Sequence, residues 1–171
     1  MSLPEPSKPN SRRRTVRKRS KYRPKGVILN PIAYVMESMT PVAKHEQFLI
    51  DLKIKNHQAM THLTRGEAVR TDIDTLIAMS NICEALYRMG FGREYQDVVK
   101  HGSDALHAVG RRGAEIGRFI LKAEEMTALN TLMELHDAQM DVITVKDMER
   151  AFRIVEEEYR QRKMRPIVEK V

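Results

Sequence analysis

The chain has little of what stabilises many small proteins. Its 171 residues include one cysteine, no tryptophan, five tyrosines and four phenylalanines. With Cys83 alone no intramolecular disulfide can form, and we expect a reducing compartment. Cys83 lies on the apolar side of a helical pattern. We therefore interpret it as a small buried hydrophobe rather than a nucleophile, which would need a cation beside it.

Long hydrophobic runs are also missing. No N-terminal segment has the roughly seven to fifteen apolar residues of a signal peptide, and none approaches the ~20 of a membrane span. We expect a soluble, cytoplasmic protein without membrane association. Strand patterns are missing too, because no alternation of apolar and polar residues reaches a useful length. With 42% hydrophobic and 31% charged residues, the composition is typical of one globular domain.

Positive charge is present in excess and is confined to one end. The chain has a net charge of +7 at pH 7. Residues 1–25 hold ten Lys and Arg against the single acid Glu5, a charge of +9, and the other 146 residues carry −2. The same segment contains four prolines and few apolar side chains. It cannot bury enough surface to offset the entropy of ordering, so we predict a disordered basic arm over residues 1–26.

Such an arm suits a polyphosphate partner, because each neutralised phosphate releases condensed counterions and Arg matches phosphate geometry. We expect it to bind DNA or RNA without reading base sequence. The predicted phosphate-contacting residues are Arg12, Arg13, Arg14, Arg17, Lys18, Arg19, Lys21, Arg23 and Lys25. A protein partner, a targeting signal or a solubilising tail remain open. A membrane anchor fits less well, because Tyr22 is the only aromatic among the bases.

The rest of the chain has helical periodicity. We predict an all-α bundle of five to six helices over residues 27–165, followed by a C-terminal tail over residues 166–171. The expected helical segments are residues 31–39, 46–64, 72–89, 93–120, 122–141 and a last one that begins at 145. The segment 72–89 is apolar over so wide an arc that it should be central, with neighbours on two sides.

Capping residues set the expected helix ends. We expect helices to start after the N-caps Asn30, Thr71 and Thr144, and to stop at Gly66 and Gly90. Asp74 follows Thr71 by three residues, and Asp147 follows Thr144 by three, so both starts are close to a capping box.

Two helical segments are less clear. In residues 93–120 the pattern is interrupted by Gly102, Gly110, Gly113 and Gly117, each costing about 1 kcal/mol relative to Ala in a helix. We favour a break near Gly110 over close helix contact at the glycines. The last helix has a two-heptad seam of Val145, Met148, Phe152, Val155 and Tyr159. We expect this seam to dock on its own bundle rather than form a dimeric coiled coil.

The histidines do not form a metal-binding pattern. His57 and His62 are about 140° apart around a helix, so they do not share a face. In "ELHD", Glu134 precedes His136 by two residues, not the three of helical di-metal sites. We interpret His136 as a hydrogen-bonded structural histidine in an apolar stripe. No metal, cofactor or catalytic constellation is supported, and we do not expect an enzyme.

The run "GRRGAEIG", residues 110–117, resembles a phosphate loop only superficially. It lacks the Lys-Ser or Lys-Thr pair of a P-loop and follows no predicted strand. Arg111 and Arg112 are candidates for a secondary phosphate contact at a helix junction, and a glycine-softened turn is the alternative.

Four stretches of the chain resemble small proteins of unknown function encoded in bacterial prophages and plasmids. They are "KYRPKGVILNPIAYVMESMTPV", "LKIKNHQAM", "RGEAVRTDIDTLIAMSNICEAL" and "ELHDAQMDVITVKDMERA", within residues 21–160. The resemblance implies a bacterial cytoplasmic setting and a mobile-element gene. It implies no catalytic residue, and it would remove the import-signal alternative for the arm.

The sequence thus predicts a non-enzymatic nucleic-acid-binding accessory or regulatory protein that acts through its arm. The helical body would supply a homo-oligomer contact or a partner surface. The alternative is a mobile-element-encoded interaction factor that binds a host or phage protein through the body.

Overall fold

The computed structural model describes residues 31–42 and 46–161, and these residues are almost entirely helical. The elements in chain order are α1 (Pro31–Ser38), α2 (Glu46–Arg65), α3 (Arg70–Met89), the 3₁₀ helix η2 (Arg93–Tyr95), α4 (Gln96–Ile116), α5 (Ala123–Val142) and α6 (Val145–Arg160). The predicted all-α bundle of five to six helices is confirmed. The predicted arm over residues 1–26 and tail over residues 166–171 lie outside the described residues.

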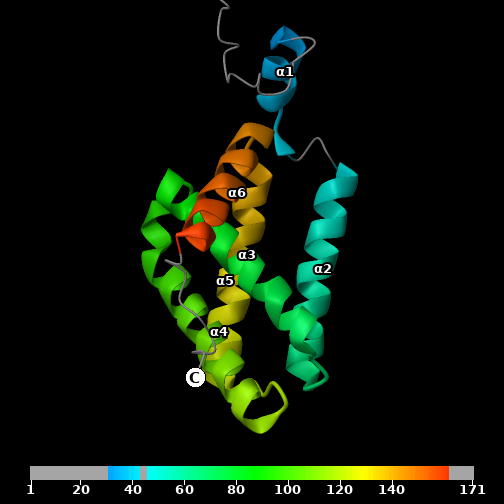
Figure 1. The fold of residues 1–171 in the computed structure, drawn as a ribbon, viewed down its shortest axis with the longest axis vertical. Coiled ribbons are helices and arrows are strands. Elements are labelled where there is room, and N and C mark those ends of the chain that lie inside the picture. The colour runs from blue at the N-terminus through cyan, green and yellow to red at the C-terminus, as the bar shows by residue number, and fades with distance from the viewer. Residues whose placement is uncertain (1–30, 43–45, 162–171) are drawn as a thin grey trace, which may run out of the picture.

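Helix α3 is at the centre, as its wide apolar arc predicts. It packs against α2, α4, α5 and α6 (Figure 1). Figure 1 also shows α1 at one end of the bundle, near the start of α6, and the α4–α5 turn at the opposite end. The most extensive contact between two described helices is between α4 and α5, which form a hairpin.

The core has two clusters, and α3 contributes to both. Leu76 and Cys83 belong to the first, with residues of α2, α4 and α5. Leu86 belongs to the second, with Met140, Ile143 and residues of α6. Two apolar faces on one helix therefore contact neighbours on two sides.

Most helix ends follow the capping chemistry of the sequence. Gly66 and Gly90 adopt positive φ of 73° and 111°, as C-terminal stops. At α6 the Asp147 N–H donates to Thr144 Oγ1 at 3.2 Å, while the Thr144 N–H donates to Asp147 Oδ2 at 3.0 Å, the predicted capping box.

The predicted start of α3 is wrong. The N-cap is Val69 rather than Thr71, and the side chain that caps the helix is Asp72 rather than Asp74. Asp72 Oδ2 accepts from the Val69 N–H at 2.9 Å, and its Oδ1 is 3.1 Å from His62 Nδ1. His62 of α2 thus contacts the same carboxylate that caps α3. The spacing of residues along the sequence does not reveal this contact between two helices.

The predicted break near Gly110 is also wrong. Helix α4 is continuous from Gln96 to Ile116 and ends at Gly117, whose φ is 81°. The glycines permit close packing instead: a Cβ on Gly102 would lie 2.6 Å from Leu132 Cδ2, and one on Gly113 would lie 2.1 Å from Phe119 Cδ1. Close contact with α5 and with the following turn offsets the low helix propensity of glycine.

Helix α6 docks on its own bundle as predicted, but not with the whole predicted seam. Met148 and Ala151 are buried, whereas Phe152 and Tyr159 are exposed. The buried face of α6 therefore centres on Met148 and Ala151, which join the second core cluster, rather than on Phe152 and Tyr159.

No helix within the described ranges combines the length and the apolar character needed to cross a bilayer.

Candidate functional site

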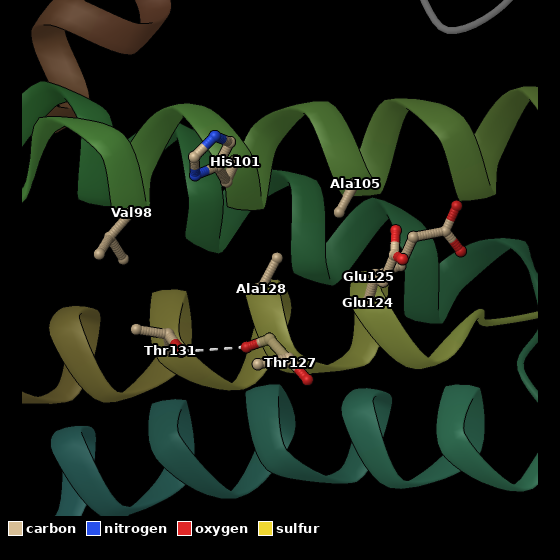
Figure 2. A pocket seen from close by; sticks show the side chains of 8 residues that line it. All are labelled: Val98, His101, Ala105, Glu124, Glu125, Thr127, Ala128 and Thr131. Atoms are coloured by element: carbon tan, nitrogen blue, oxygen red, sulfur yellow. Dashed lines mark hydrogen bonds between the residues drawn. The ribbon is translucent and has the colours of Figure 1, made fainter.

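A groove of about 490 Å³ runs along the α4–α5 hairpin on the described surface. Figure 2 shows Val98 and Ala105 projecting from α4 towards α5; His101 on α4 and Thr127, Ala128 and Thr131 on α5 also line the groove. Both helices come together here because Gly102 admits the Leu132 side chain at the adjoining position. The volume falls within the range of ligand pockets, but the groove is open.

Two hydroxyl groups of the groove are engaged by the backbone of their own helix. Ala105 and Ala128 give an apolar floor between the helices. The Thr131 hydroxyl donates to the Thr127 carbonyl at 3.0 Å, and the Thr127 hydroxyl donates to the Ala123 carbonyl at 3.2 Å. Both hydroxyls are thus engaged by their own helix, and the lining residues present no nucleophile paired with a base.

Glu125, which lines the groove, forms an ion pair with Arg112. Arg112 Nη1 donates to Glu125 Oε2 at 3.0 Å and to the Ile120 carbonyl at 3.0 Å, and its Nη2 donates to Glu125 Oε1. The Lys122 N–H donates to Glu125 Oε2 at 2.8 Å. With the two side chains 18% and 12% exposed, this forked pair fixes the end of α4 against the start of α5.

The candidate phosphate contacts Arg111 and Arg112 lie beside this ion pair. They line a second hollow of about 350 Å³, together with Lys122, Glu115 and Glu125. Three cations against two carboxylates leave this hollow with a charge of about +1. Arg112 is held by Glu125, while Arg111 and Lys122 are exposed. Any secondary phosphate contact would therefore fall to Arg111 and Lys122, and Lys122 was not predicted from the sequence.

The nine predicted phosphate-contacting residues of the arm, Arg12 to Lys25, lie outside the described residues, so no geometry joins them to Arg111. The described residues contain 15 Lys and Arg against 21 Asp and Glu, a net charge of −6 with neutral histidines. On α5 alone there are five acids and no Lys or Arg. The helical surface is thus acidic overall.

The two histidines of α2 contact different helices, in keeping with their predicted separation. His57 Nε2 is 2.9 Å from Asp137 Oδ2 on α5, and His62 Nδ1 is 3.1 Å from Asp72 Oδ1 on α3. Within the described part of the chain, no three His, Cys, Asp or Glu side chains come together as metal ligands.

The buried polar groups have a structural character. Burial lowers the pKa of His136 to about 4 and raises the pKa of Cys83 to about 12. Gln139 Nε2 donates to the carbonyls of Cys83 and Phe91 at 3.2 and 3.0 Å, which ties α5 to α3. His136 Nδ1, Asn56 Nδ2 and Gln139 Oε1 have no hydrogen-bond partner among the described residues. The sequence predicted a hydrogen-bonded His136, but its Nδ1 atom has no partner among the described residues.

The sequence contains a usable signal for only part of this site. Glu125 follows Lys122 by three residues, the spacing of a capping box, and could have been recognised as the start of α5. The pairing of Glu125 with Arg112, thirteen residues away, depends on the α4–α5 turn. Comparison with protein-family models, curated proteins and solved structures finds no match to this chain.

Proposed function

We propose that the protein is a non-enzymatic nucleic-acid-binding accessory, which uses the Lys and Arg residues of its N-terminal arm on the phosphates of DNA or RNA. The observation that carries this proposal is the segregation of charge: +9 in residues 1–25 and −6 in the described helical residues. An acidic body is repelled by a polyanion, so the binding energy has to come from the arm.

The ion pairs of the body support the same assignment. Lys53 Nζ is 3.0 Å from Asp141 Oδ1, Arg112 is held by Glu125, and Arg88 contacts both Glu84 and Glu158. A guanidinium that already holds a carboxylate would have to leave it in order to bind phosphate. Lys53, Arg88 and Arg112 are therefore poor competitors of the arm. A bacterial mobile-element setting, implied by the resemblance above, belongs to this proposal.

The test compares the full chain with a chain lacking residues 1–25, on duplex DNA and on RNA, over a salt series. With six or more phosphate contacts, the affinity of the full chain should fall on the order of a thousandfold between 50 and 200 mM salt. The truncated chain should bind neither polymer. A full chain in which Arg111 and Lys122 are replaced by Ala is the matched control and should keep most of the affinity.

A second function is favoured by the α4–α5 groove, whose apolar floor could hold a side chain of a host or phage protein. In that case removal of residues 1–25 leaves partner binding unchanged, and Ala128→Arg, which fills the groove, abolishes it. Met126→Arg is the matched control, because this α5 side chain is exposed and does not line the groove. Unchanged nucleic-acid affinity after truncation would favour this second function over the first.

A further inference from the structure

Two carboxylates on the groove side of α5 have no partner among the described residues. Glu124 lines the α4–α5 groove and is exposed. Glu134 is also exposed, and it follows Thr127 by seven residues and Thr131 by three, so it lies on the side of α5 that faces the groove. Neither Glu124 nor Glu134 forms an ion pair or a side-chain hydrogen bond within the described residues. Both are therefore available to cations from elsewhere.

The remaining groove defines what kind of occupant would fit. The other three acids of α5 already contact basic side chains of neighbouring helices, namely Glu125 with Arg112, Asp137 with His57 and Asp141 with Lys53. No Lys or Arg lines the groove, and Ala105 and Ala128 form its apolar floor. Glu124 and Glu134 are ten residues apart, about 15 Å along the helix. A fitting occupant has cations about this far apart with a small apolar group between them.

One segment of this chain has that chemistry. Residues 12–19, "RRRTVRKR", lie outside the described residues and carry six Arg and Lys around one apolar side chain, Val16. In an extended chain the five residues from Arg14 to Arg19 span about 17 Å, close to the separation of Glu124 and Glu134. Val16 between them suits the apolar floor.

The groove also lies within reach of this segment. Figure 1 shows α1 at one end of the bundle and the α4–α5 turn at the opposite end. The Val42 N–H donates to the Ile143 carbonyl at 2.9 Å, which places the chain after α1 against the end of α5. From Ile143, Glu134 is about 14 Å back along α5 and Glu124 about 29 Å. The eight residues of α1 and residues 39–42 add about 25 Å.

The arm has the length to cover these distances. Arg19 precedes Pro31 by twelve residues, which reach about 40 Å when extended, and Arg14 precedes it by seventeen, which reach about 56 Å. The corresponding paths from Pro31 are about 39 Å to Glu134 and about 54 Å to Glu124. Exposed ion pairs are individually weak, but the tether keeps the arm at a high effective concentration beside the groove, so weak contacts suffice.

We propose that residues 12–19 of the arm dock in the α4–α5 groove of the same chain, with their cations on Glu124 and Glu134. DNA or RNA then has to displace the arm from the groove, so docking lowers the affinity for nucleic acid. This consequence rests on the proposed function, and it makes the groove a regulator of the arm.

The test attaches a nitroxide to the full chain through Ser11→Cys, next to the docking segment, and records the broadening of backbone amide NMR signals. Cys83 is buried, so the label reacts with the new thiol. In about 0.1 M salt without nucleic acid, the signals of Ala105 and Ala128 should lose more intensity than that of Ala151 on α6. In about 1 M salt, where the Debye length is about 3 Å, this difference should disappear.

A pair of substitutions, Glu124→Gln with Glu134→Gln, should abolish the broadening at the groove. The matched control is Glu67→Gln with Glu157→Gln, which removes the same charge at exposed positions outside the α4–α5 hairpin and should keep it. Because the first pair frees the arm, it should raise the affinity of the full chain for duplex DNA at least about threefold above the control. The amide spectrum of each variant verifies its fold.

Equal broadening at Ala128 and Ala151, no broadening at low salt, or equal effects of the two pairs of substitutions would overturn the proposal. Undiminished broadening when the nitroxide and the isotope label are on different chains would overturn it too, because the groove would then hold the arm of a second copy. The NMR experiment needs no nucleic acid, so the two proposals are separable. Docking without affinity for DNA or RNA contradicts the proposed function alone, and affinity without docking contradicts this inference alone.

Discussion

Replacing Gly102 by Ala sets two opposing effects against each other. Alanine favours helix over glycine by about 1 kcal/mol. The new Cβ, however, would lie 2.6 Å from Leu132 Cδ2 and 2.7 Å from Leu132 Cβ, about 1 Å inside ordinary carbon–carbon contact. Leu132 Cβ is fixed by the α5 backbone, so rotation of the side chain cannot relieve this contact. Overpacking of a core typically costs about 1–3 kcal/mol.

We expect the contact to outweigh the propensity, so that Gly102→Ala lowers the free energy of unfolding by about 2 kcal/mol, the upper overpacking cost less the helix gain. For a chain of 171 residues this corresponds to a decrease in Tm of about 4–8 °C. Urea unfolding followed by circular dichroism measures it. Ser103→Ala is the matched control, because it raises helix propensity on the same turn without adding an atom. If Gly102→Ala stabilises the protein by about as much as helix propensity alone predicts, close packing at Gly102 is refuted.

Three further perturbations test other parts of the structure. Burial lowers the pKa of His136 to about 4, so the free energy of unfolding should be at its full value above about pH 6.5 and fall by roughly 3 kcal/mol on acidification to pH 4. In urea unfolding, the His136→Leu variant should lose this part of the pH dependence. Thr144→Ala removes the hydroxyl that accepts from the Asp147 N–H and should cost about 1 kcal/mol of unfolding free energy; an unchanged urea midpoint would argue against the cap. The Cys83 thiol is fully buried with its pKa raised to about 12, so a thiol reagent should modify it only after unfolding, and rapid labelling of the native chain would contradict this.

The sequence predicts those features that depend on a few neighbouring residues. Gly66, Gly90 and the Thr144–Asp147 pair mark helix ends through local backbone chemistry, and the structure confirms them. The central position of α3 is also predictable, because its apolar residues cover two faces and each face needs a partner.

The features that sequence reasoning missed depend on what an element packs against. A glycine-rich segment breaks at Gly110 only if no packing contact stabilises a continuous helix. Leu132 packs closely at Gly102 and Phe119 at Gly113, and these contacts stabilise α4 as one helix. In the same way, Ala151 rather than Phe152 is buried, because the spacing of apolar residues leaves the rotation of a helix undetermined. The pair of Arg112 with Glu125 and the groove beside it exist only once α4 and α5 form a hairpin.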